Sequence, residues 1–231
     1  MREYVRGVAE ADLPAERAIE PRWPVALAVF IYIVITIVLR LVVPRRESLG
    51  PHWLIPLVEI VLLVVLVLAH PSSAAERARL RKVAIALIAL LVVSALLSTT
   101  ILIGELIKGS KVTESADSLL ASGVLVYLGN ALAFGLLYWQ LDSGGPLARY
   151  RRDHEHRDFA FTQQLSPELA PPDWRPQYVD YFVLGFTTST AFSPTDVMPL
   201  TPWAKLTMSL QSLISLAVVG LVIARAVNVF S

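Results

Sequence analysis

The residues best suited to chemistry gather in a short polar segment near the C-terminus. Hydroxyl side chains, a proline and a carboxylate follow a short apolar run there, and the candidate residues are Thr187, Thr188, Thr190, Ser193, Pro194, Thr195 and Asp196. At membrane depth such groups are tolerated only where protein buries them or water reaches them. A half-crossing helix followed by a polar return segment is how re-entrant pore loops are built. The segment therefore predicts a pore loop, with a short interfacial helix and a proline-rich turn as the alternative.

The composition places this segment in a membrane protein. Of the 231 residues, 55% are apolar and 17% are charged, and the mean hydropathy is +0.59. In soluble proteins about 45–50% of the residues are apolar and about 25% are charged on average. The difference excludes a disordered chain and an ordinary cytosolic enzyme. The net charge of +1 offers no field to attract polyanions, so no nucleic-acid partner is expected. The lack of cysteine excludes disulfides, iron–sulfur clusters and cysteine-ligated zinc.

Five segments approach or exceed the roughly 20 apolar residues that a membrane-spanning helix needs. They are Pro24–Val43, Trp53–Ala69, Val83–Ile107, Leu119–Leu141 and Trp203–Val229. The second has 17 residues and is at the short limit. We therefore expect an all-α, multi-pass protein of the cell membrane (plasma or inner membrane), with five transmembrane helices and a re-entrant half helix before the last one.

The expected organisation has three parts. These are a polar N-terminal tail (1–23), a three-helix transmembrane region (24–118) and a pore-like module (119–231). The module divides into an outer helix (119–141), a basic loop (142–176), a re-entrant segment (177–200) and an inner helix (201–230).

The run from Thr190 to Pro202 resembles the two-helix pore module of potassium channels. Their filter reads TTVGYGD and is commonly followed by a stretch similar to ITPxTP. In ungapped register the coinciding positions are Thr190, Asp196, Pro199, Thr201 and Pro202. The similarity covers roughly residues 119–231 and implies a homotetramer that conducts monovalent cations around a shared axis. The chain also resembles an uncharacterised family of bacterial multi-pass membrane proteins, which implies no activity.

The filter positions depart from the potassium-channel pattern. Ser193 and Thr195 stand where that family has two glycines, and Pro194 stands where it has an aromatic residue. Glycine lets successive carbonyls face the ion, whereas threonine is strained at positive φ and proline fixes φ near −65°. We therefore expect a wider, hydrated and weakly selective cation path lined by hydroxyls and by a ring of Asp196 carboxylates.

Polar residues also recur along one face of the last predicted helix. Thr207, Gln211 and Ser215 follow one another at intervals of four. In an inner pore helix they would line a cavity below the filter. The alternative is that they form hydrogen bonds between helices, as small polar residues do in bilayers.

Two charged residues lie inside predicted spans, Glu59 in the second and Arg225 near the end of the fifth. Ionisable groups within a membrane are functional candidates by default, and Glu59 could serve a proton relay. The alternative is a structural ion pair with Arg40 or Arg225, or a protonated, hydrogen-bonded carboxyl group.

The loop sequence His154-Glu155-His156 does not predict a metal site. Alternation along a strand would place the two histidines on opposite faces, and a metal site wants three or four converging ligands. A solvated charged segment is expected instead. The chain has no glycine-rich phosphate loop, no assembled catalytic triad and no zinc-protease motif. Neither an enzyme nor a cofactor is therefore expected.

Two features of the sequence, its charge distribution and its resemblance to potassium channels, disagree about the membrane orientation. A cytoplasmic N-terminus places most of the 20 Lys and Arg residues in the cytoplasm, as the positive-inside rule prefers. With five spans the pore loop then faces the cytoplasm, whereas in potassium channels it faces outward. The predicted function is an oligomeric, channel-like cation pathway. The alternatives are a non-conducting membrane scaffold that binds a partner and a proton-coupled transporter that uses Glu59.

Overall fold

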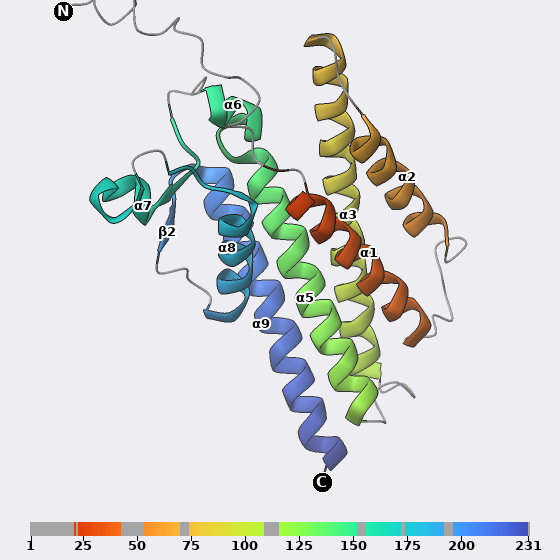
Figure 1. Cartoon of the computed structure of the whole chain (residues 1–231). Coiled ribbons are helices and arrows are strands. Elements are labelled where there is room, and N and C mark those ends of the chain that lie inside the picture. Colours follow the sequence, from red (N-terminus) through yellow and green to blue (C-terminus); the bar gives the residue numbers. More distant parts are fainter. Residues whose placement is uncertain are drawn as a thin grey trace, which may run out of the picture.

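The computed structural model describes residues 21, 23–42, 53–69, 74–108, 116–151, 156–171, 174–191 and 196–230 (Figure 1). Its larger helices are α1 (Trp23–Val42), α2 (Leu54–Leu68), α3 (Ala74–Lys108), α5 (Ala116–Leu141), α8 (Tyr178–Ala191) and α9 (Pro202–Phe230). Short elements lie between α5 and α9: η1 (Asp142–Gly144), α6 (Pro146–Arg151), β1 (Phe159–Phe161), α7 (Thr162–Leu165), η2 (Pro167–Leu169) and β2 (Val197–Pro199).

Among the residues that the structure describes, four helices are long and apolar enough to cross a membrane. The stretches are Trp23–Leu41, Ala78–Ile107, Asp117–Gly144 and Pro202–Val227. This confirms the expected all-α membrane fold. The predicted second span is shorter, because α2 has 15 residues and rises only about 22 Å, below the roughly 30 Å of hydrocarbon. Helix α2 is nevertheless apolar and runs back alongside α1 (Figure 1).

Helix α3 starts earlier than its apolar stretch. It begins at Ala74, nine residues before the predicted start at Val83. The added turns read AAERARLRK, and alanine, arginine, leucine, lysine and glutamate are all strong helix formers. The helix therefore continues beyond the apolar stretch as a charged extension.

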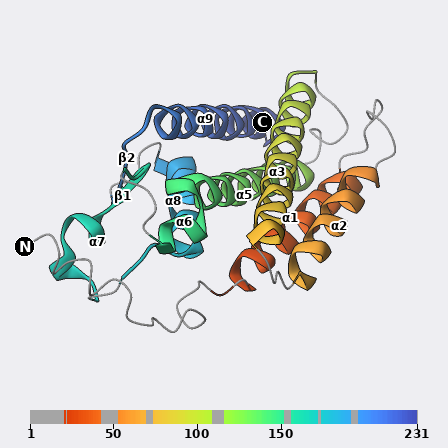
Figure 2. The ribbon, with the colours of Figure 1, turned by 90° about the horizontal axis from the view of Figure 1, so that it is seen from above.

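Helix α5 is the centre of the bundle. It packs against α1, α3, α8 and α9, and the views in Figures 1 and 2 agree on this position. Of its span-forming stretch 67% is buried within the chain, compared with 28% for α9. Close contact is possible because small residues face the neighbours: a side chain added at Gly123 would meet Val222 at 2.9 Å. The segment predicted as an outer helix is therefore surrounded by the rest of the chain.

The predicted basic loop, 142–176, is folded over much of its length. It carries η1, α6, β1, α7 and η2, and β1 pairs antiparallel with β2. The register places Phe159 opposite Pro199 and Phe161 opposite Val197. An aromatic cluster anchors this sheet to the bundle, and it includes Phe134, Tyr138, Phe159, Phe161 and Tyr181. The described part of the loop is therefore a cap on one end of the bundle, and we refer to residues 142–151 and 156–171 as the cap.

The surface of α9 is strongly apolar. Large side chains point away from the chain along its length, among them Leu206, Leu213 and Ile223, with 70%, 64% and 59% of their surface exposed. A soluble protein rarely exposes such a continuous apolar face. Lipid or neighbouring copies of the chain suit this surface.

Candidate functional site

Helix α8 enters the bundle only part of the way. It has 14 residues, about half the 29 of α9, and lies beside α5 and α9 (Figure 1). Two glycines permit the approach: a Cβ on Gly185 would stand 2.7 Å from the Ala131 carbonyl oxygen, and one on Gly135 would stand 3.1 Å from the backbone at Tyr181 and Phe182. The α5 and α8 backbones are therefore in direct contact.

The chain returns to the end of the bundle where α8 began. Asp196, the first described residue after α8, lies close enough to Asp180 in the first turn of α8 for their charges to interact. Its carbonyl oxygen accepts hydrogen bonds from the backbone N–H and the hydroxyl of Thr162, which follows β1. The β1 residue Phe161 in turn packs against the Tyr181 ring, 5.2 Å between centroids. A half-length helix is thus followed by a return segment.

Burial raises the pKa of Asp180, and the nearby Asp196 charge raises it further. A hydrogen bond from the Gln177 N–H to the Asp180 carboxylate, 2.7 Å, acts in the opposite direction. This bond satisfies a backbone donor just before the first turn of α8, as side chains commonly do at helix starts.

The last turns of α8 carry the predicted hydroxyls. Thr187 donates to the carbonyl of Val183, Ser189 to that of Gly185 and Thr190 to that of Phe186, at 2.8, 3.0 and 2.7 Å. The Thr188 hydroxyl is fully buried and has no hydrogen-bond partner among the described residues. Thr190 is exposed, and its hydroxyl is hydrogen-bonded to that of Tyr127 on α5 at 2.5 Å. Thr190 therefore marks the accessible side of the end of α8.

The predicted filter itself falls largely outside the described residues. Ser193, Pro194 and Thr195 lie in the segment 192–195, of which the structure describes nothing. Asp196 is described and exposed.

The residues predicted to line a cavity are packed between helices. The Gln211 amide donates to the carbonyl of Gly185 and to the Ser189 hydroxyl, at 2.7 and 2.8 Å, and Tyr138 donates to its oxygen at 2.7 Å. Gln211 and Ser215 are buried, and Thr207 bonds to carbonyls of its own helix. Within a single chain, Gln211 therefore joins α5, α8 and α9, which corresponds to the interhelical alternative.

Sequence reasoning missed a carboxylate that organises the cap. Asp142 is buried, and its oxygens accept hydrogen bonds from the Tyr181 hydroxyl, the Ser143 hydroxyl and the backbone N–H groups of Asp158 and Phe159. The stretch DSGG has the composition of a turn, and Ser143, Gly144 and Gly145 adopt positive φ. Nothing in the turn composition showed that its acid side chain would bind the first turn of α8.

A second carboxylate, Asp158, ties the cap to α9. It accepts hydrogen bonds from the Ser143 N–H, the Thr201 hydroxyl and the Trp203 indole N–H, at 2.7, 2.8 and 2.7 Å. The sequence places Asp158 in what was predicted to be a solvated charged run. It differs from its neighbours there because it precedes the buried strand β1, which carries it inward.

Arg149 of α6 completes the cap. Its guanidinium donates to the carbonyls of Trp139 and Asp142, at 2.6 and 2.9 Å, and lies 4.8 Å from the centroid of the Tyr181 ring. It thus covers the end of α5 and the start of α8 together. The first turn of α8 is held from three sides, by α5, β1 and α6.

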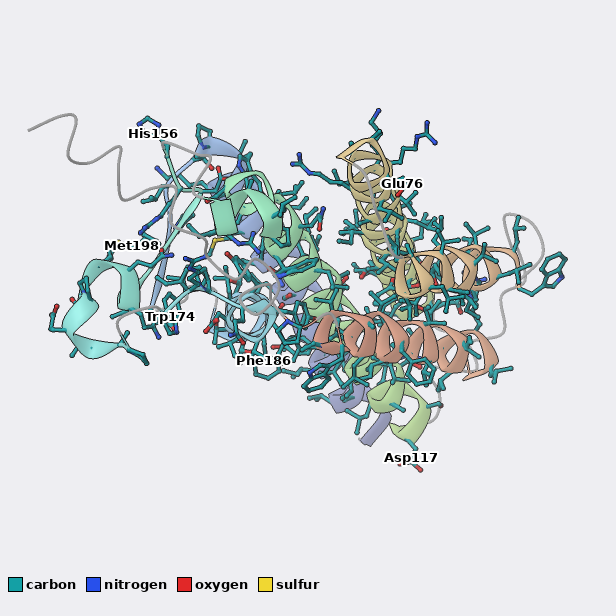
Figure 3. All side chains as sticks on the ribbon, turned by 45° about the horizontal axis from the view of Figure 1, so that its top comes forward. Glu76, Asp117, His156, Trp174, Phe186 and Met198 are labelled. Atoms are coloured by element: carbon teal, nitrogen blue, oxygen red, sulfur yellow. The ribbon has the colours of Figure 1, made fainter. Side chains whose placement is uncertain are left out.

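The described residues contain no group of three His, Cys, Asp or Glu side chains that could hold a metal ion. His154 and Glu155 lie outside the described residues. His156 is exposed at the outer edge of the cap, far from the acidic residues Glu76 and Asp117 (Figure 3). Trp174 lies on the inner side of the cap, where its ring packs against Phe161.

Glu59 and Arg225 are not brought together by any contact that the structure shows. Glu59 lies on α2 and is buried against α1 and α3, where the charge of Arg40 on α1 acts on its carboxyl group. Arg225 lies half-buried in the last turns of α9. Of the two ion-pair partners considered from the sequence, only Arg40 is in the vicinity of Glu59.

No protein-family model, no curated protein and no solved structure matches this chain.

Proposed function

We propose that this protein is an oligomeric cation pathway of the cell membrane, in which copies of α8 and the segment after it surround a shared axis. The observation that carries the proposal is the half-length helix whose following segment returns to the same end of the bundle. Irregular polar backbone at membrane depth is tolerated where it lines a water-filled path. One such segment per chain supplies one wall of a pore, so several copies are required.

The direction of α8 suits a cation. The carbonyl end of a helix carries roughly half a negative charge, and in α8 this end is followed in the sequence by the polar segment 192–196. In membrane proteins the carbonyl ends of half helices commonly coordinate cations. The side-chain hydroxyls at this end mostly donate to carbonyls of their own helix. They therefore do not take the place of a cation at the carbonyl end of the helix. A ring of exposed Asp196 carboxylates would concentrate cations at the mouth.

The assembly fits the exposed surface of the chain. Helix α9 presents the apolar face described above, and Val179, Val183 and Phe186 of α8 are exposed beside it. These faces suit packing between copies, and a homotetramer is the number that the resemblance to potassium channels implies. The path would pass monovalent cations with weak selectivity, because the two filter glycines are absent.

Water must reach the end of α8 if the proposal holds. The chain has no cysteine, so a single introduced cysteine is a specific probe. We expect Thr190→Cys to react with a charged, membrane-impermeant thiol reagent in proteoliposomes, because this position lies at the accessible end of α8. The control Leu213→Cys, on the apolar face of α9, should stay unreactive. Equal protection of both cysteines would contradict a water-filled path at α8.

A further inference from the structure

Helix α2 turns its one charged residue inward. Its apolar side chains Leu57, Val58, Ile60 and Val61 are each at least 40% exposed, whereas Glu59 between them has no exposed surface. The only buried residues of α2 are Pro56 and Glu59. The helix therefore packs against α1 and α3 around a carboxyl group, which is the reverse of what apolar burial alone would give.

The surroundings of Glu59 come from two neighbouring helices. Helix α3 places the buried Ser94 hydroxyl next to it. Helix α1 contributes Tyr32, whose buried hydroxyl lies near Ser94 and donates to the Leu91 carbonyl at 2.7 Å. Among the described residues, the charged and titratable groups that face Glu59 are Arg40 and Tyr32, both on α1.

Neither carboxyl oxygen of Glu59 accepts a hydrogen bond of ordinary geometry from any described residue, although the Ser94 hydroxyl is close enough to act on the carboxyl group. Arg40 is close enough for its charge to act on Glu59, but it does not donate to it. An ionised carboxylate without donors in an apolar interior is very costly, and such a group ordinarily takes up a proton or a cation instead. The packing thus describes a neutral carboxylic acid better than an ion pair.

We propose that Glu59, with the Ser94 and Tyr32 hydroxyls beside it, is a proton-binding site of the α1–α2–α3 group, separate from the pore-loop module. The proton is held on a Glu59 oxygen, and the neighbouring hydroxyl oxygens can accept its hydrogen bond. On release the carboxyl O–H bond breaks, the proton passes to water, and the carboxylate that remains is next to the Arg40 guanidinium. The site thus alternates between a neutral acid and a carboxylate paired with Arg40.

Glu59→Gln tests the protonation state because glutamine copies the neutral acid in shape and charge. We expect the midpoint of thermal unfolding of the purified protein to stay unchanged. An ionised Glu59 paired with Arg40 would instead make Glu59→Gln strongly destabilising, because it would leave a buried cation uncompensated. A large loss of stability in this variant would therefore overturn the proposal.

Infrared difference spectroscopy between neutral and alkaline buffer tests proton release directly. We expect the carbonyl band of a protonated carboxylic acid at neutral pH, its loss at alkaline pH, and its absence from Glu59→Gln. The matched control is Glu105→Gln, which changes a half-buried glutamate of α3 and should keep the band. A spectrum of Glu59→Gln identical to that of the unmutated protein would overturn the proposal. If sodium ions at constant pH remove the band, the site binds a metal cation in place of the proton, and the proposal of a proton site is wrong.

Discussion

Gly185→Ala is expected to separate α8 from α5 and to destabilise the protein by roughly 3 kcal/mol, the upper part of the range for overpacked sites. The added Cβ would stand 2.7 Å from the Ala131 carbonyl oxygen and 3.0 Å from the Gly135 nitrogen. Both are backbone atoms of a central helix, so no side chain can rotate out of the way. The same shift would disturb the Gly185 carbonyl that accepts the Gln211 amide.

The measurement is thermal unfolding in detergent, followed by circular dichroism. Gly220→Ala is the control, since a Cβ at that position of α9 has nothing within 4 Å. Its midpoint should stay the same or rise slightly, because alanine favours a helix over glycine. Equal midpoints for Gly185→Ala and Gly220→Ala would contradict the direct backbone contact between α5 and α8.

Asp142→Ala is expected to cost on the order of 3–5 kcal/mol, because it removes a buried acceptor of several hydrogen bonds and leaves their donors unpaired. The donors include the Tyr181 hydroxyl and the backbone N–H of Phe159. Tyr181→Phe removes only one of these bonds and should cost about 1–2 kcal/mol. The graded loss would show that Asp142 joins α8 to the cap.

Chemical or thermal unfolding of the two variants checks this order. Glu168→Ala is the matched control, since Glu168 is an exposed acid of the same cap. Its effect should be within about 0.5 kcal/mol of zero. If Asp142→Ala is no more destabilising than Glu168→Ala, the carboxylate does not organise the cap.

The long helices could be predicted because apolar stretches of that length permit little else. The first span, expected at Pro24–Val43, is observed as α1 at Trp23–Val42, and the inner helix expected at 201–230 is observed as α9 at Pro202–Phe230. The span count was less certain where a stretch was short, and α2 is indeed shorter than the membrane core. The start of α3 was missed because charged helix formers carry no apolar signal.

The cap could not be predicted, since its structure depends on pairing across the chain. Strand β1 has three residues, too few for an alternating pattern, and it exists because Val197–Pro199 pairs with it. Asp142 and Asp158 look like solvent-exposed acids in a polar loop, and only the folded chain brings their partners to them. Gln211 joins three helices, and a regular spacing on one helix cannot tell a cavity from a neighbouring helix.

The central claim is that the segment after α8 conducts cations, and ion flux tests it most directly. The full-length protein would be reconstituted in vesicles loaded with potassium and then with sodium, alongside Asp196→Asn and the control Glu168→Gln. We predict efflux of both cations, reduced several-fold in Asp196→Asn because the ring of negative charge at the mouth is lost, and unchanged in Glu168→Gln. Efflux that is the same in all three proteins, or none from a reconstituted protein that is a monomer, would contradict the account.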